Sequence, residues 1–126
     1  MTSARPLRAT VIALDNRTRE DAWSCLVAAG ASVETCRFFG ELADVRAGAL
    51  VVFPDDYPDD EILRALKALR ARRPRVRMVL VTSRPRYFEE LLVSRRGGVA
   101  PQILPRPVFA WALVDAVRGD VTSRPL

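Results

Sequence analysis

The sequence predicts an α/β fold: a doubly wound, five-stranded parallel sheet with helices on both faces. Five short apolar segments alternate with segments whose apolar residues recur at helical spacing. Several of the short segments, such as 49–53, are apolar throughout, which is typical of parallel strands covered on both faces. The length of 126 residues fits one domain with a core of ordinary size.

We therefore expect a single domain over residues 1–126, with a core from 8 to 119 and a tail from 120 to 126. The expected strands are 9–14, 31–36, 49–53, 76–82 and 102–104. Right-handed crossover connections would place the intervening helices on both faces of the sheet.

Capping residues and breakers delimit the expected helices. The first is predicted to begin with Thr18 as its cap and to stop at Gly30. Its apolar stripe would comprise Ala22, Trp23, Leu26 and Ala29. The others are a short helix over 38–45, one capped by Asp59 or Asp60 and ended before Pro74, one from Pro85 to Gly97-Gly98, and one over 109–118.

Composition excludes several kinds of site. The chain has no histidine, which excludes a His-based catalytic triad, and Cys25 and Cys36 lack the spacing of a zinc motif. The net charge of +5 comes from 20 basic residues, all arginine except Lys67. No aromatic residue interrupts the arginines of 70–77, so we expect a solvated surface there and no nucleic-acid binding. We expect no enzymatic activity.

The sequence also lacks an apolar segment long enough to cross a membrane, and charged residues follow the N-terminal stretch at once. We therefore expect a cytoplasmic protein that does not bind membranes.

Polar residues follow four of the expected strands. They are Asp15-Asn16, Pro54-Asp55-Asp56, Thr82-Ser83 and Arg106-Pro107. In an open parallel sheet these positions lie at the carboxyl edge, where ligand sites occur.

These positions resemble the receiver domain of response regulators, over residues 8 to 119. The resemblance implies a flavodoxin-like fold, a Mg²⁺-binding acid pair after the first strand, and a phosphoacceptor aspartate after the third. It also implies a phosphate-contacting hydroxyl after the fourth strand, and a lysine before a cis-proline after the fifth. Asp15 and Asn16 fall at the acid-pair position, Thr82 at the hydroxyl position, and Arg106-Pro107 at the Lys-Pro pair.

The resemblance is incomplete at the acceptor. Pro58 matches a proline four residues beyond the acceptor, and this register puts Pro54 at the acceptor position. Proline has no carboxylate, so the remaining candidates are Asp55 and Asp56, displaced along the loop. Asp15 alone would bind Mg²⁺ at most weakly, so we expect no cofactor unless one of these two acids is phosphorylated.

Arg106 keeps the positive charge of the family's lysine. We hypothesise that it pairs with Asp15 or Asp55 across the crevice and takes the place of Mg²⁺ as the counter-charge.

The resemblance therefore favours a stand-alone, atypical receiver, or pseudo-receiver, in bacterial signalling. It would act through a protein partner and independently of aspartyl phosphorylation. Two alternatives remain open. One is a phosphorelay receiver phosphorylated on Asp55 or Asp56, and the other is a domain that binds a nucleotide or other small anion near Thr82 and Arg106.

The last helix carries a candidate interface residue. Its predicted core-facing stripe consists of Phe109, Leu113, Ala116 and Val117, and Trp111 falls on the opposite side. An exposed tryptophan there would fit a partner surface or a homodimer through this helix. Alternatively, Trp111 lies flat against a neighbouring helix or the tail.

Overall fold

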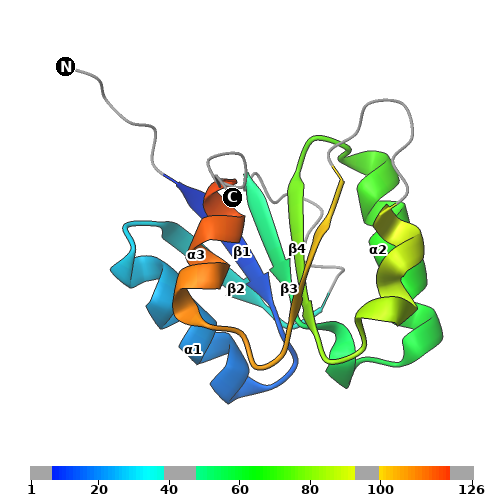
Figure 1. Ribbon diagram of the computed structural model, residues 1–126, viewed down its shortest axis with the longest axis horizontal. Helices are drawn as coiled ribbons and strands as arrows, with labels where there is room; N and C mark the ends of the chain where they lie inside the picture. Colours follow the sequence, from blue (N-terminus) through cyan, green and yellow to red (C-terminus); the bar gives the residue numbers. More distant parts are fainter. Residues whose placement is uncertain (1–6, 39–47, 93–99, 120–126) are drawn as a thin grey trace, which may run out of the picture.

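A computed structural model describes residues 7–38, 48–92 and 100–119. Its centre is a five-stranded, fully parallel sheet in the order β2-β1-β3-β4-β5 (Figure 1). The strands are β1 (Arg8–Ile12), β2 (Ser32–Cys36), β3 (Ala49–Val52), β4 (Arg77–Thr82) and β5 (Gln102–Pro105). The doubly wound parallel sheet predicted from the sequence is confirmed.

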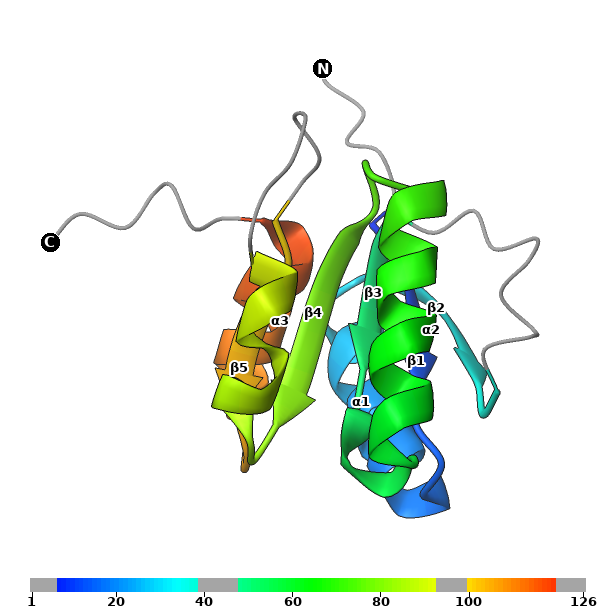
Figure 2. The same ribbon diagram turned by 90° about the vertical axis from the view of Figure 1, so that its right-hand side faces the viewer.

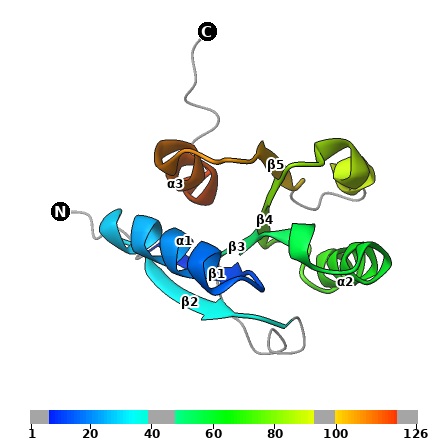
Figure 3. The ribbon, with the colours of Figure 1, turned by 90° about the horizontal axis from the view of Figure 1, so that it is seen from below.

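Helices cover both faces of the sheet, as predicted (Figure 3). The helical elements are α1 (Asn16–Ala28), the 3₁₀ turn η2 (Pro54–Asp56), α2 (Asp59–Arg72), the 3₁₀ helix η3 (Pro85–Leu92) and α3 (Ala110–Arg118). The first and last of the α-helices, α1 and α3, pack on one face, and α2 and η3 pack on the other. Figure 2 views the molecule from the side of α2 and η3, and Lys67 of α2 forms an ion pair with Glu90 of η3.

Each central strand contributes to two separate cores. Side chains of a strand alternate between the faces, so Val11, Val51 and Val79 pack under α1 and α3. Their neighbours Ile12, Val52 and Leu80 pack under α2 and η3, with Phe88 of η3 fully buried. This burial on both faces explains why the strand segments are continuously apolar.

Two predicted helix starts are wrong. Asp15, not Thr18, caps α1, because its carboxylate accepts a hydrogen bond from the backbone N–H of Thr18. Pro58 precedes α2, so Asp59 and Asp60 lie inside its first turn, where negative charge is favourable. The predicted end of α1 is confirmed, with Gly30 at φ +96° just beyond it.

Three predicted features of side-chain packing or helix type also differ. Trp23 was placed in the apolar stripe of α1 but is 44% exposed, because Ala22 and Leu26 face the sheet. Phe109 is 67% exposed because it precedes α3 as its N-terminal cap and lies off the helical face. The fourth expected helix is a 3₁₀ helix as far as it is described.

Some predictions fall on residues that the structure does not describe. These are nearly all of the helix over 38–45, the stop at Gly97-Gly98 and the tail over 120–126. Within the described ranges, every helix is too short or too polar to cross a lipid bilayer.

Candidate functional site

The four polar strand ends lie along the carboxyl edge of the sheet, because parallel strands all end at the same edge. Asp15 follows β1, Pro54 and Asp55 follow β3, Thr82 ends β4, and Arg106 follows β5. The Arg106–Pro107 peptide bond is cis, as the resemblance implied for this position.

Pro54 is buried at the first position of η2. Proline suits the first residue of a helical turn because its missing N–H would have no partner there. The residue before it, Phe53, continues the strand by donating its N–H to the carbonyl of Ile12 at 2.9 Å. The turn that starts at Pro54 directs the next residue, Asp55, towards β4.

The carboxylate of Asp55 is the centre of the site. Its Oδ1 accepts a hydrogen bond of 2.5 Å from the hydroxyl of Thr82. Its Oδ2 accepts two bonds of 2.9 Å, from the backbone N–H and the hydroxyl of Ser83. Arg106 Nη1 lies 3.7 Å from the same oxygen. Arg106 thus pairs with Asp55, one of the two partners hypothesised for it.

These neighbours set the charge of the site. Partial burial raises the pKa of Asp55, but hydrogen bonds from Thr82 and Ser83, together with Arg106, outweigh burial and lower this pKa below its usual value. Only 15% of the Asp55 side chain is exposed, so these interactions are partly shielded from water. The site therefore holds one carboxylate and one guanidinium at neutral pH.

Asp56, the other displaced candidate, is exposed on the same turn. The contacts that Thr82, Ser83 and Arg106 make with a carboxylate in the described part of the chain all go to Asp55.

Asp15 and Asn16 are engaged at the start of α1. Asp15 Oδ2 accepts bonds of 2.8 and 2.9 Å from the N–H and hydroxyl of Thr18, and these bonds lower its pKa. The side-chain oxygen of Asn16 accepts a bond from Arg19.

The residues present do not fit the Mg²⁺ ion that the receiver fold implies. Mg²⁺ requires several hard oxygen ligands in octahedral geometry. Within residues 7–38, 48–92 and 100–119, no three Asp, Glu or Cys side chains gather closely enough to hold a metal ion. We therefore derive no chemistry through Mg²⁺ at this site.

A second acid also holds the segment after β4. Arg84 forms a bidentate ion pair with Asp59 of α2, with N–O distances of 2.6 and 3.0 Å. The N–H of Arg84 also donates to the hydroxyl of Thr82 at 2.9 Å. The sequence did not predict this pair or the role of Ser83, because neither follows a periodic pattern.

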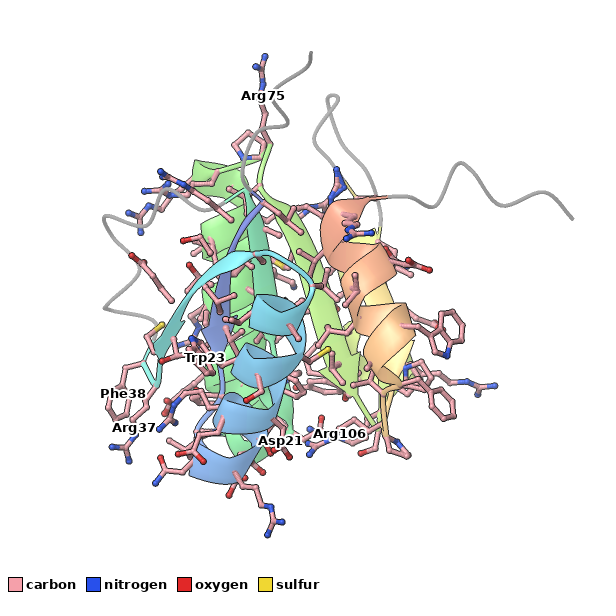
Figure 4. All side chains as sticks on the ribbon, turned by 90° about the vertical axis from the view of Figure 1, so that its left-hand side faces the viewer. Asp21, Trp23, Arg37, Phe38, Arg75 and Arg106 are labelled. Atoms are coloured by element: carbon pink, nitrogen blue, oxygen red, sulfur yellow. The ribbon has the colours of Figure 1, made fainter. Side chains whose placement is uncertain are left out.

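A groove lies beside Arg106, between α1 and the segment leading into α3. It encloses about 330 Å³. Phe53, Val81 and Leu113 are among its apolar lining residues. Asp21 and Arg106 provide charged groups, and Figure 4 shows these two side chains near each other.

Trp111 is 64% exposed at the start of α3, as predicted. Its ring stacks on that of Phe109, with centroids 6.3 Å apart and planes inclined by 10°. Within residues 7–38, 48–92 and 100–119, the aromatic ring that stacks on Trp111 thus belongs to another exposed residue. Sequence periodicity missed this pair because it assigned Phe109 to the core.

Asp55 should stabilise the fold in a pH-dependent way. Because its pKa is lowered in the folded state, its contribution is present above the unfolded value of about 3.9 and is lost as pH falls through the folded value. Replacing Asp55→Asn should therefore cost about 1–2 kcal/mol of unfolding free energy near pH 7. The cost should shrink below about pH 4.

Chemical denaturation across pH measures this difference, and Asp56→Asn is the matched control. The exposed Asp56 should change stability by less than about 0.5 kcal/mol. An Asp55→Asn effect that is equally large at pH 3 and pH 7, in protein still folded at both, would contradict the assignment.

No protein-family model matches the sequence, and no curated protein matches it significantly. Solved structures match at the level of the fold. A CheY-like receiver domain protein from Methanospirillum hungatei JF-1 aligns with a TM-score of 0.72 and 15% identity, over 94% of this chain and 96% of that chain. The signal receiver domain of an HD domain-containing protein from Pseudomonas fluorescens Pf-5 gives 0.71 and 13%, over 94% and 97%.

A third structure, described as a transiently phosphorylated "switch" in bacterial signal transduction, gives a TM-score of 0.70 at 20% identity. It aligns over 91% of this chain and 94% of that chain. At such identities the likeness concerns the fold, and it extends over nearly the whole chain. The protein therefore has the flavodoxin-like fold of CheY-like receiver domains.

Proposed function

We propose that this protein is an atypical receiver in bacterial signalling that acts through a protein partner in the cytoplasm, without phosphorylation of an aspartate. The observation that carries the proposal is the buried Pro54 at the end of β3, where the resemblance places the acceptor. The receiver fold supports the signalling role.

The remaining acids support independence from phosphorylation. Phosphoryl transfer needs a nucleophilic oxygen and positive charge around the transferred group. Hydrogen bonds from Thr82 and Ser83 weaken the carboxylate oxygens of Asp55 as nucleophiles, and its cationic neighbour Arg106 is already paired with it. Asp56 is exposed on the same turn, and the ion pair of Arg106 is with Asp55. We assign no enzymatic activity to the chain.

Incubation with acetyl phosphate and Mg²⁺ should leave the protein unmodified, because Pro54 offers no acceptor oxygen. Intact-mass spectrometry measures this, with an ordinary receiver domain as the positive control. A phosphorylated product in the wild type would overturn the proposal. If the phosphorylated product then disappears in Asp55→Asn or in Asp56→Asn, the substituted residue is the acceptor, and the phosphorelay alternative is established.

The stacked pair of Phe109 and Trp111 is the proposed partner surface. Two large aromatic side chains that are each more than 60% exposed offer an anchor of the kind enriched at binding hot spots. Because the pair lies at the start of α3, a homodimer through this helix is the simplest arrangement that would cover it.

If the homodimer forms, Trp111→Ala should weaken it by about 2 kcal/mol, or roughly thirtyfold in the dissociation constant. Sedimentation over a range of protein concentrations measures the effect. Trp23→Ala is the control, because Trp23 is also partly exposed but lies on α1. Equal self-association of wild type and Trp111→Ala, or a wild type that stays monomeric throughout, would exclude the homodimer.

The groove beside Arg106 favours a second candidate function, the binding of a small anionic molecule such as a nucleotide. Its volume of about 330 Å³ is within the range of small-molecule sites, and it combines apolar walls with a guanidinium group. Arg106 has a side chain that is 33% exposed, so one side of it is open to a ligand.

If this candidate is correct, AMP should raise the melting temperature. At a concentration one hundred times its dissociation constant, AMP should add about 2.7 kcal/mol to the unfolding free energy. Arg106→Gln should remove the shift, whereas Arg64→Gln, on the exposed side of α2, should retain it. No shift with AMP, GMP or inorganic phosphate would exclude this function.

A further inference from the structure

Three hydrogen-bond donors and one cation converge on one point at the carboxyl edge of the sheet. They are the hydroxyl of Thr82, the N–H and hydroxyl of Ser83, and the guanidinium of Arg106. A backbone N–H, two hydroxyls and a guanidinium are the groups with which proteins bind oxyanions. This arrangement is an anion-binding site, and the carboxylate of Asp55 lies in it.

We infer that Asp55 is the built-in occupant of this anion site. Its carboxylate holds the segment Thr82–Arg84 and Arg106 in place, a role that would otherwise require an external oxyanion. The inference deepens the proposed function and rests on it, because it explains how the carboxyl edge keeps one conformation without a phosphoryl group.

The orientation of Thr82 supports this assignment. Thr82 is fully buried, so its hydroxyl is shielded from water. The Thr82 oxygen accepts the N–H of Arg84 at 2.9 Å, and its proton is donated to Asp55. Without a carboxylate opposite it, this buried donor would lose its partner, which is costly. The hydroxyl therefore needs an acceptor at that point, and the carboxylate of Asp55 supplies it.

The site also draws together parts of the chain that are distant in sequence. Asp55 lies after β3, Ser83 after β4 and Arg106 after β5. Their contacts with one carboxylate tie the three strand ends to each other. The neighbouring Arg84–Asp59 pair joins the same loop to α2, but it lies on the surface and should contribute less.

Removing the carboxylate should leave an empty site that a small oxyanion can fill. In Asp55→Ala, the amide of Ser83 should exchange its hydrogen roughly tenfold faster than in the wild type, because one charge-assisted hydrogen bond is lost. Formate, which is the size of the deleted group, or inorganic phosphate should restore slow exchange at Ser83 and raise the melting temperature of this variant. In the wild type, whose site is filled, exchange at Ser83 should respond to neither anion.

Two further variants sharpen the test. Asp56→Ala should keep slow exchange at Ser83 and should gain no response to formate, because Asp56 is exposed outside the site. Asp55→Ala combined with Arg106→Gln should lose the rescue, because the cation is gone. If Asp55→Ala does not fold, Asp55→Asn keeps the side-chain volume, and faster exchange at Ser83 then serves as the readout.

Unchanged exchange at Ser83 in Asp55→Ala, or no rescue by either anion, would overturn the inference. Failure of the proposed function is distinguishable from this, because it would show as phosphorylation of the wild-type protein by acetyl phosphate. Hydrogen exchange at Ser83 tests whether Asp55 fills the anion site, and intact-mass spectrometry tests whether the wild type is phosphorylated, so the two can fail independently.

Discussion

The arrangement of the carboxyl edge depends on one carboxylate. Asp55 accepts hydrogen bonds from Thr82 and Ser83 and lies beside Arg106, so it links the ends of β3, β4 and β5. The guanidinium of Arg106 also lies over the ring of Phe53, 5.8 Å from its centroid, so the ends of β3 and β5 meet there as well. A buried carboxylate is costly unless it is paired and hydrogen-bonded, and here both conditions are met. The pairing of Asp55 with Arg106 balances the charge of the site.

Pro54 makes this geometry possible. Proline begins the 3₁₀ turn η2, and the turn rotates the next residue towards β4. The acid that reaches Thr82 is therefore the one after the strand end and not the strand-end residue itself. At the other end of the crevice, Asp15 and Asn16 bind Thr18 and Arg19 of α1.

The fold could be predicted from the sequence because strands such as β3 are continuous apolar segments and because breakers such as Gly30 and Pro74 end the helices. Pro54, Thr82 and Arg106 could be placed because they directly follow such strands. The choice between Asp55 and Asp56 could not, since it depends on the rotation of a single 3₁₀ turn, which no periodic pattern records. The Arg84–Asp59 pair depends on the relative position of two loops. Trp23 and Phe109 were misplaced because the helical face is ambiguous beside a small residue such as Ala22 and before a helix begins.

The site and the aromatic surface are joined by a short piece of chain. Arg106 and Pro107 lead directly to Phe109, and Val108 between them packs against the core under α1 and α3. A carboxylate that restrains Arg106 therefore also restrains the start of α3, where Phe109 and Trp111 stack. A binding surface that is already ordered loses less entropy when a partner binds. Under the proposed function, the fixed pairing at the carboxyl edge would thus keep the aromatic pair ordered before a partner binds.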